Sequence, residues 1–142
     1  MSDLFSAEQL LIDRIKTKTT DFVTVANPSA ISGLTNFSGV LPACIIAPGK
    51  SVIDSQEMRG NFAIEEQFWD VVVIVTHQIG DSGTEQLASS LMSSVIKALS
   101  NFDLGEGFVR PMNYNGRPEN ANYALTFAEF VMSFKVKKIV GI

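Results

Sequence analysis

Two long stretches of the chain, Ile64–His77 and Tyr123–Val140, carry apolar residues in the patterns expected of strands. In the first, alternating apolar and polar residues give way to the continuous apolar run Val71–Val75, which is typical of a strand that begins half exposed and ends in the middle of a sheet. In the second, the apolar positions change from odd to even numbers near Ala128 and Glu129. A β-bulge there would bring both halves to one face, and without a bulge the halves face opposite sides.

The length of the C-terminal stretch predicts that it bends or protrudes. At about 3.3 Å per residue it would run roughly 60 Å if straight, whereas a compact globule of this length has a diameter of about 37 Å. We therefore expect this strand to reach a neighbouring copy, so that Phe134→Asp would abolish assembly and leave the chain folded. The side chains predicted at the contact between copies are Phe130, Met132, Phe134 and Val136, with Trp69 as a second anchor.

Two segments have the period of amphipathic helices. Ala7–Lys18 places its apolar residues on one stripe, with Ser6 as the N-cap and Gln9 three residues later, as a capping box requires. Thr84–Asn101 has an apolar half and a polar, serine-rich half, as expected of a helix that lies on a sheet.

The segments between these elements predict short strands and turns. Leu41–Ala47 is an apolar run closed by Pro48-Gly49, which indicates a strand followed by a turn. Phe108–Met112 is a short strand that Pro111 assigns to a sheet edge. The other segments are a candidate strand at Asp21–Val25, a loop at Asn27–Gly39, a loop or hairpin tip at Gly49–Asn61 and a turn at Asn113–Asn122.

Together these elements predict a single α+β domain over residues 1–142. Its sheet is expected to be mainly antiparallel and four-stranded, with two helices packed on it in the order α-β-β-α-β-β. The long C-terminal strand is bent or protruding.

Composition favours association over an isolated chain. Apolar residues make up 46% of the sequence and charged residues only 18%, whereas charged residues usually make up about a quarter of a soluble protein. An oligomer would bury the excess apolar surface. The net charge of −4 argues against a general nucleic-acid binder. Basic clusters around Arg14 and at Lys135, Lys137 and Lys138 are interpreted as solvated ends of elements. The alternative is a patch that complements acidic residues of a neighbour, such as Asp70.

Little in the sequence indicates a reaction. His77, the single histidine, follows a strand, and Cys44, the single cysteine, lies among apolar residues; we interpret both as structural. A nucleophilic dyad of the two is the alternative. The acidic residues, including Glu66 and Asp70, lack metal-ligand spacing. We expect no catalytic site, metal or cofactor, and neither a signal peptide nor a transmembrane helix.

The order of the elements resembles the tail terminator proteins of long-tailed phages, of the lambda and Mu types. The resemblance covers almost the whole chain, as a layout of elements, and is carried by Ala7–Ile15, Leu41–Ile46, Phe68–Val75, Leu91–Leu99 and Tyr123–Phe127. It implies a small α+β subunit that forms a hexameric ring on the last ring of the tail tube, stops tube polymerisation and presents a surface to the head-side connector or neck protein. In contractile tails the sheath is a further contact.

The resemblance also implies a location in the tail or neck of the virion, and in the host cytoplasm during assembly. Within the ring, a protruding strand could extend the sheet edge of a neighbouring subunit. We expect no membrane partner and no specific nucleic-acid binding. Two alternatives stay open: a head-closure or connector ring subunit of a phage, and a small cytosolic hydrolase or ligand-binding oligomer with a pocket around His77 or Cys44.

Overall fold

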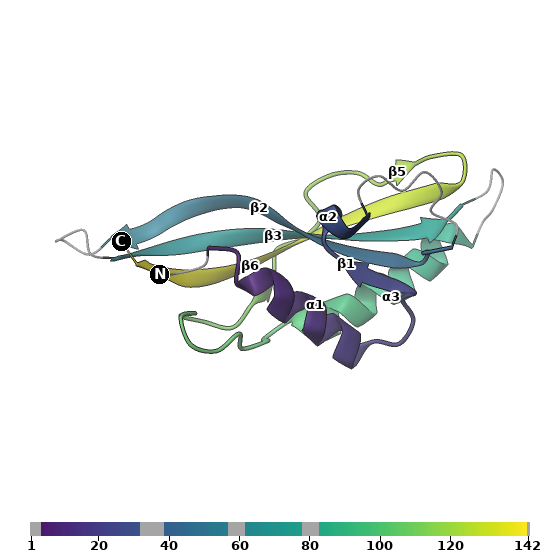
Figure 1. Ribbon diagram of the computed structural model, residues 1–142. Helices are drawn as coiled ribbons and strands as arrows, with labels where there is room; N and C mark the ends of the chain where they lie inside the picture. The colour runs from purple at the N-terminus through teal and green to yellow at the C-terminus, as the bar shows by residue number, and fades with distance from the viewer. Residues whose placement is uncertain (1–3, 32–38, 57–61, 78–82, 142) are drawn as a thin grey trace.

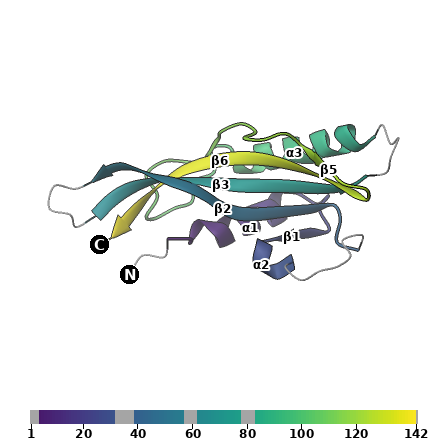
Figure 2. The same ribbon diagram turned by 90° about the horizontal axis from the view of Figure 1, so that it is seen from above.

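The computed structural model describes residues 4–31, 39–56, 62–77 and 83–141. One long, twisted sheet carries two helices on the same face (Figures 1 and 2). The elements in chain order are α1 (Ala7–Lys18), β1 (Thr24–Ala26), α2 (Pro28–Ile31), β2 (Ala43–Gln56), β3 (Phe62–Thr76), α3 (Thr84–Leu99), β4 (Asn113–Tyr114), β5 (Asn122–Tyr123) and β6 (Phe127–Gly141).

The α+β class is confirmed, but the predicted four-stranded sheet is wrong in detail. The sheet has six strands in the order β1-β2-β3-β6-β4, and β5 also pairs with β6. It is mixed, because β1 runs parallel to β2 while the pairs β2–β3, β3–β6, β4–β6 and β5–β6 are antiparallel. The short helix α2 adds a third helix that the sequence pattern did not indicate.

The two long helices lie where their apolar stripes predict, and they form the core with one face of the sheet. Leu11 and Ile15 of α1 and Val95 of α3 are fully buried against Val71 and the other odd-numbered residues of β3. The bounds of α1 match the prediction, and α3 ends two residues early. The predicted capping box is not formed.

The side chain of Ser6 makes no cap hydrogen bond. The Gln9 Nε2 group instead donates to Asp13 Oδ1 at 2.8 Å, one turn further along the same helix.

The strand β2 continues through Pro48-Gly49, so the predicted turn at this dipeptide is wrong. The register against β3 shifts between Pro48 and Ser51 and again between Ile53 and Ser55, and such irregularities let an extra residue pass without ending a strand. A Cβ atom on Gly49 would lie 2.8 Å from the backbone oxygen of Phe68, so only glycine fits here without movement. The predicted loop at Gly49–Asn61 is therefore strand as far as Gln56, and residues 57–61 lie outside the described residues.

The predicted C-terminal strand begins four residues late, because its first part belongs to a hairpin. Tyr123 ends β5, and the Ala124 N–H donates to the Phe127 carbonyl oxygen at 2.8 Å across the turn. From Phe127 to Gly141 the strand β6 pairs with β3 without any register shift, so there is no bulge at Ala128. The change of the apolar positions from odd to even numbers therefore reflects the turn from β5 into β6 and not a bulge.

Among the remaining short elements, the strand predicted at Phe108–Met112 is wrong, because only Phe108 of this segment bridges to the sheet, and the others are displaced by a few residues. The candidate strand at Asp21–Val25 appears as β1, and the predicted loop at Asn27–Gly39 begins with α2, while residues 32–38 lie outside the described residues. Phe108 forms an isolated bridge to Lys138. The predicted turn at Asn113–Asn122 contains β4 and the start of β5.

The long strands β2, β3 and β6 extend together past α1 as a three-stranded arm (Figures 1 and 2). The strand β6 alone has 15 residues, about 50 Å at ~3.3 Å per residue. The protrusion expected of the last strand is therefore shared by three strands, and the C-terminal end of β6 lies opposite the start of β3 at the end of the arm.

Candidate assembly surface

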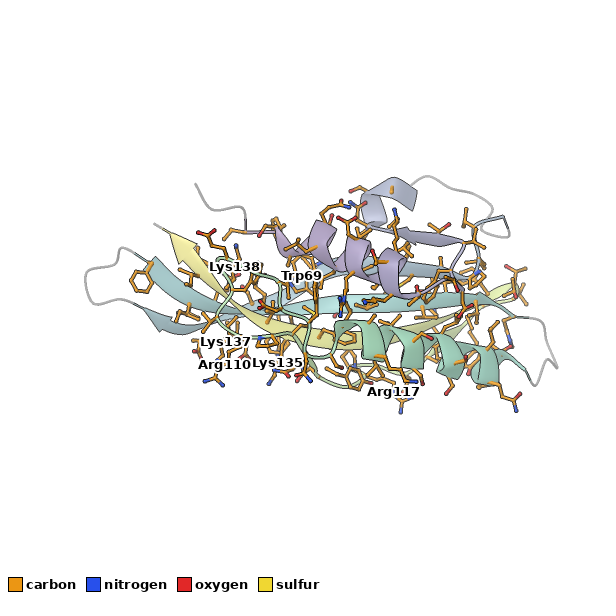
Figure 3. All side chains as sticks on the ribbon, turned by 90° about the horizontal axis from the view of Figure 1, so that it is seen from below. Trp69, Arg110, Arg117, Lys135, Lys137 and Lys138 are labelled. Atoms are coloured by element: carbon orange, nitrogen blue, oxygen red, sulfur yellow. The ribbon has the colours of Figure 1, made fainter. Side chains whose placement is uncertain are left out.

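The five side chains predicted at the contact between copies all lie in the core of the single chain. The exposed fraction is 9% for Phe130, 0% for Met132 and Phe134, 2% for Val136 and 1% for Trp69. These positions of β6 pair with the odd-numbered residues of β3 and face the helices, and Figure 3 shows Trp69 near α1. Within the single chain these side chains are therefore covered by the two long helices and are not exposed to a neighbour.

Large apolar side chains are exposed instead at the end of the arm. We call Val52, Ile53, Phe62 and Ile139 the arm tip; their exposed fractions are 51%, 57%, 39% and 42%. They come from three different strands within a few residues of one another in register, but not from one face: Val52, Phe62 and Ile139 lie on the face away from the helices, and Ile53 lies on the helix face. Exposed apolar residues that lie together on one face, as the first three do, are typical of a contact surface.

The outer edge of β2 is less suited to pairing with another strand. The strand β1 covers only Ala43–Ile45, so the rest of β2 has no further strand beside it among the described residues. This edge carries Pro48, Lys50 and both register shifts, which are the devices that keep sheet edges from pairing. A partner is therefore better received by side chains of the arm than by an added strand.

The basic residues of β6 do not form one patch. Lys135 and Lys137 lie on the face away from the helices, where the Lys137 Nζ atom is 3.2 Å from Asp54 Oδ2. Lys138 lies on the opposite face, only 6% exposed, with its Nζ atom 4.6 Å from the centre of the Phe108 ring. Figure 3 shows these lysines along β6, with Arg110 beside them.

One carboxyl group on the face away from the helices is perturbed. Partial burial, together with the negative charge of Glu119, raises the pKa of Asp70 above its ordinary value. Asp70 pairs with Ser133 in the sheet register. Burial is the larger of the two causes, and no cation pairs with Asp70 among the described residues.

The structure does not bring Cys44 and His77 together. Cys44 is fully buried in the core, and this burial raises the pKa of its thiol, which keeps it protonated. It pairs with Val73, four residues before His77 on the neighbouring strand, which is about 13 Å along the strand. The His77 Nδ1 atom lies 3.0 Å from Thr84 Oγ1, and its ring packs on Tyr123.

A cleft of about 720 Å³ lies on the other half of the sheet, between α3 and the chain that runs along the free side of β6. Sequence reasoning gave no sign of it, because its walls come from segments far apart in the chain. Its lining includes Ala88, Ser89, Met92, Ile96, Phe130 and Val131.

Among the described residues, no three His, Cys, Asp or Glu side chains gather as a metal site would require. None of the described helices has the length and apolar character needed to span a membrane.

No protein-family model matches the sequence, and no curated protein does. Among solved structures, the chain is similar to a chain in the structure titled "Virion of native gene transfer agent (GTA) particle", with 14% sequence identity and a TM-score of 0.51. The similarity covers 94% of this chain and 87% of that chain. A chain of a virion therefore shares this fold.

Proposed function

We propose that this chain is a non-enzymatic structural subunit of a phage-like virion. The observation that carries the proposal is the fold likeness to a chain of a gene transfer agent virion over 94% of the length of this chain. The exposed apolar arm tip supports it, because a subunit of an assembly is expected to expose such side chains until it meets its neighbours.

Within such a particle, we propose the role of a tail terminator. The order of elements resembles that family, and the corresponding function is a ring of six copies that caps the tail tube, ends its polymerisation and offers a surface to the head-side connector or neck protein. A closed ring of identical subunits uses two different patches on each subunit. The arm tip is one such patch, at one end of an elongated chain (Figure 1).

The first test is the state of the purified full chain. Size-exclusion chromatography with light scattering, followed by electron microscopy, is expected to show a ring of six copies. Added to polymerising tail tube protein from the same particle, the ring is expected to bind one tube end and shorten the tubes.

Three results would contradict part or all of this proposal. A chain that stays monomeric and binds no tube end contradicts the proposal. Rings that bind the connector and ignore the tube indicate a head-closure subunit instead. Turnover of a substrate by the chain would contradict the non-enzymatic role.

A further inference from the structure

The cleft beside β6 exists because the chain between β4 and β5 is too long to follow the strand. We call residues 115–121 the strap. Tyr114 pairs with Phe134, and continuing that register would place residue 119 opposite Glu129, but Asn122 lies there. Three additional residues therefore leave the edge of β6, and the strap forms the outer wall of the cleft.

One residue of β6 has backbone groups without a partner at the floor of this cleft. The odd-numbered residues of β6 direct their N–H and C=O away from β3. At one end of the strap, the Ser133 carbonyl oxygen accepts from the Asn115 N–H at 2.7 Å, and the Ser133 N–H donates to the Gly116 carbonyl oxygen at 2.8 Å. At the other end Glu129 is paired with β5. Val131 lies between them and has no partner on this side among the residues that the structure describes.

This unpaired position favours a ligand that is itself a peptide. A peptide backbone offers one donor and one acceptor per residue, which together match the C=O and N–H of Val131. From Ser133 to Glu129 the strand advances four residues, or about 13 Å, so about three residues of an added segment fit between the two ends of the strap. A volume of about 720 Å³ is within the range of ~300–1,000 Å³ that is usual for binding pockets.

The register of β6 predicts where the side chains of such a segment point. A residue opposite Val131 directs its side chain to the face away from the helices. Its two neighbours lie opposite Phe130 and Met132 and direct their side chains towards α3. On this wall α3 exposes the short side chains of Ser89 and Ser93, and most of its apolar lining is buried. Small side chains therefore suit the two neighbouring positions.

Carboxylates outnumber cations around the cleft. Its lining includes Glu85 and Glu119 against one cation, Arg117, and Glu129 lies at one end of its floor. Glu85 accepts from the Tyr123 hydroxyl at 2.9 Å. Within the described part of the chain, none of these three carboxylates forms a salt bridge. The cleft therefore favours a positively charged ligand.

Two of these carboxylates lie on the side to which the central side chain of an added segment would point. Glu129, like Val131, is an odd-numbered residue of β6 and faces away from the helices. Asp70 is on the same face, and the negative charge of Glu119 adds to burial, the larger cause, in raising the pKa of Asp70. A lysine or arginine opposite Val131 would therefore meet negative charge.

We propose that the cleft binds an extended segment of another protein in which a lysine or arginine stands between two small residues. The backbone of the basic residue pairs with Val131, and its side chain lies near Glu119 and Glu129, while the small side chains face α3. Such a site goes beyond the proposed function, because it requires neither the ring nor the tail tube.

This chain does not supply such a segment from its described residues. A basic residue between two glycine, alanine, serine or threonine residues occurs at Thr17–Thr19 and at Gly49–Ser51. The first follows the end of α1, where Thr19 is only 9% exposed. The second is part of β2, where the Lys50 Nζ atom lies 4.9 Å from the centre of the Phe68 ring. Both are held in the fold, so the segment is assigned to another protein.

Titration of the isotope-labelled full chain with capped five-residue peptides, followed by nuclear magnetic resonance, tests the site. A peptide with a central lysine among alanines is expected to shift the Val131 amide signal saturably, with the millimolar affinity that two hydrogen bonds and an exposed ion pair allow. With a central glutamate, binding is expected to be at least about threefold weaker. With N-methyl-lysine, which cannot donate to the Val131 carbonyl oxygen, it is expected to be about threefold to tenfold weaker.

Two matched pairs of variants locate the site. Ser89→Trp fills the cleft and is expected to remove the shift, whereas Ser90→Trp, at the exposed neighbouring position outside the lining, is expected to keep it. Glu119→Gln is expected to weaken binding of the lysine peptide by about two- to fivefold. Glu106→Gln, at an exposed carboxylate outside the lining, is expected to leave it unchanged. Circular dichroism checks that all four variants fold.

Three outcomes overturn the site. They are equal binding of the three peptides, no shift of the Val131 signal at millimolar peptide, and an equal shift in Ser89→Trp. A Val131 signal that moves with the concentration of the chain itself places a second copy in the cleft and overturns the assignment to another protein. Rings that form from a chain that binds no peptide leave the proposed function intact. Peptide binding by a chain that stays monomeric contradicts the ring and leaves the site intact.

Discussion

Replacing Phe134 with alanine is expected to destabilise the single chain, whereas replacing Phe62 is expected to affect assembly. Both are phenylalanines on the central strands, but Phe134 is 0% exposed and Phe62 is 39% exposed. A fully buried phenylalanine loses about 3–5 kcal/mol on substitution by alanine, from lost burial plus the cavity that remains. The total stability of a domain is about 5–15 kcal/mol. Phe134→Asp would in addition bury an unpaired carboxylate, so we expect that variant to unfold, contrary to the expectation from sequence.

The assay is urea unfolding at a concentration where the chain is monomeric, since assembly adds apparent stability. Trp69 is the only tryptophan and is 1% exposed, so its fluorescence reports the core. With an m-value of about 2 kcal/mol/M, Phe134→Ala is expected to lower the midpoint by roughly 2 M. Phe62→Ala is expected to lower it by no more than about 0.5 M, because partly exposed positions cost about 1 kcal/mol or less. If Phe134→Ala keeps its midpoint and loses assembly, the assignment of this side chain to the core is refuted.

Three further predictions concern single positions. Gly49→Ala is expected to lower the free energy of unfolding by about 1–3 kcal/mol, because the added Cβ atom would meet the backbone oxygen of Phe68 in β3. Gly39→Ala is the control, because a Cβ atom there meets nothing within 4 Å. Thermal unfolding of the two variants is compared, and equal effects would contradict the close approach at Gly49. The raised pKa of Asp70 means that its ionisation in the folded chain costs stability as pH rises through that pKa, so Asp70→Asn is expected to raise the melting temperature at pH 7 and to have no such advantage below pH 3.8. A smaller gain is expected from Glu119→Gln, which removes the second cause of the raised pKa, and no gain from Asp70→Asn at pH 7 would contradict the raised pKa. The buried Cys44 thiol, with its raised pKa, is expected to react with a thiol reagent only after unfolding, and rapid labelling of the native chain would show that the core opens there.

The sequence by itself determined the elements whose pattern repeats among near neighbours. The apolar stripe of α3 recurs at helical spacing, and the change along β3 from alternating to continuous apolar residues marks its passage into the centre of the sheet. Both patterns have periods of a few residues and can therefore be recognised within a short segment of the sequence. The same holds for α1, whose bounds follow from its own residues.

Tertiary structure decided where strands end and what covers their faces. Leu125 is apolar but 76% exposed in the turn between β5 and β6. The apolar pattern therefore predicted one continuous strand where the structure has a hairpin. Pro48-Gly49 has the composition of a turn, yet β2 continues to pair with β3 on both sides of this dipeptide, with a shift in register between Pro48 and Ser51. The sequence pattern of the apolar face of β6 is the same whether helices of the same chain or another subunit bury that face. In this chain α1 and α3 bury it. The cleft beside the strap depends on the pairing of β4 and β5 with one edge of β6, which is a relation between distant segments that no local pattern carries.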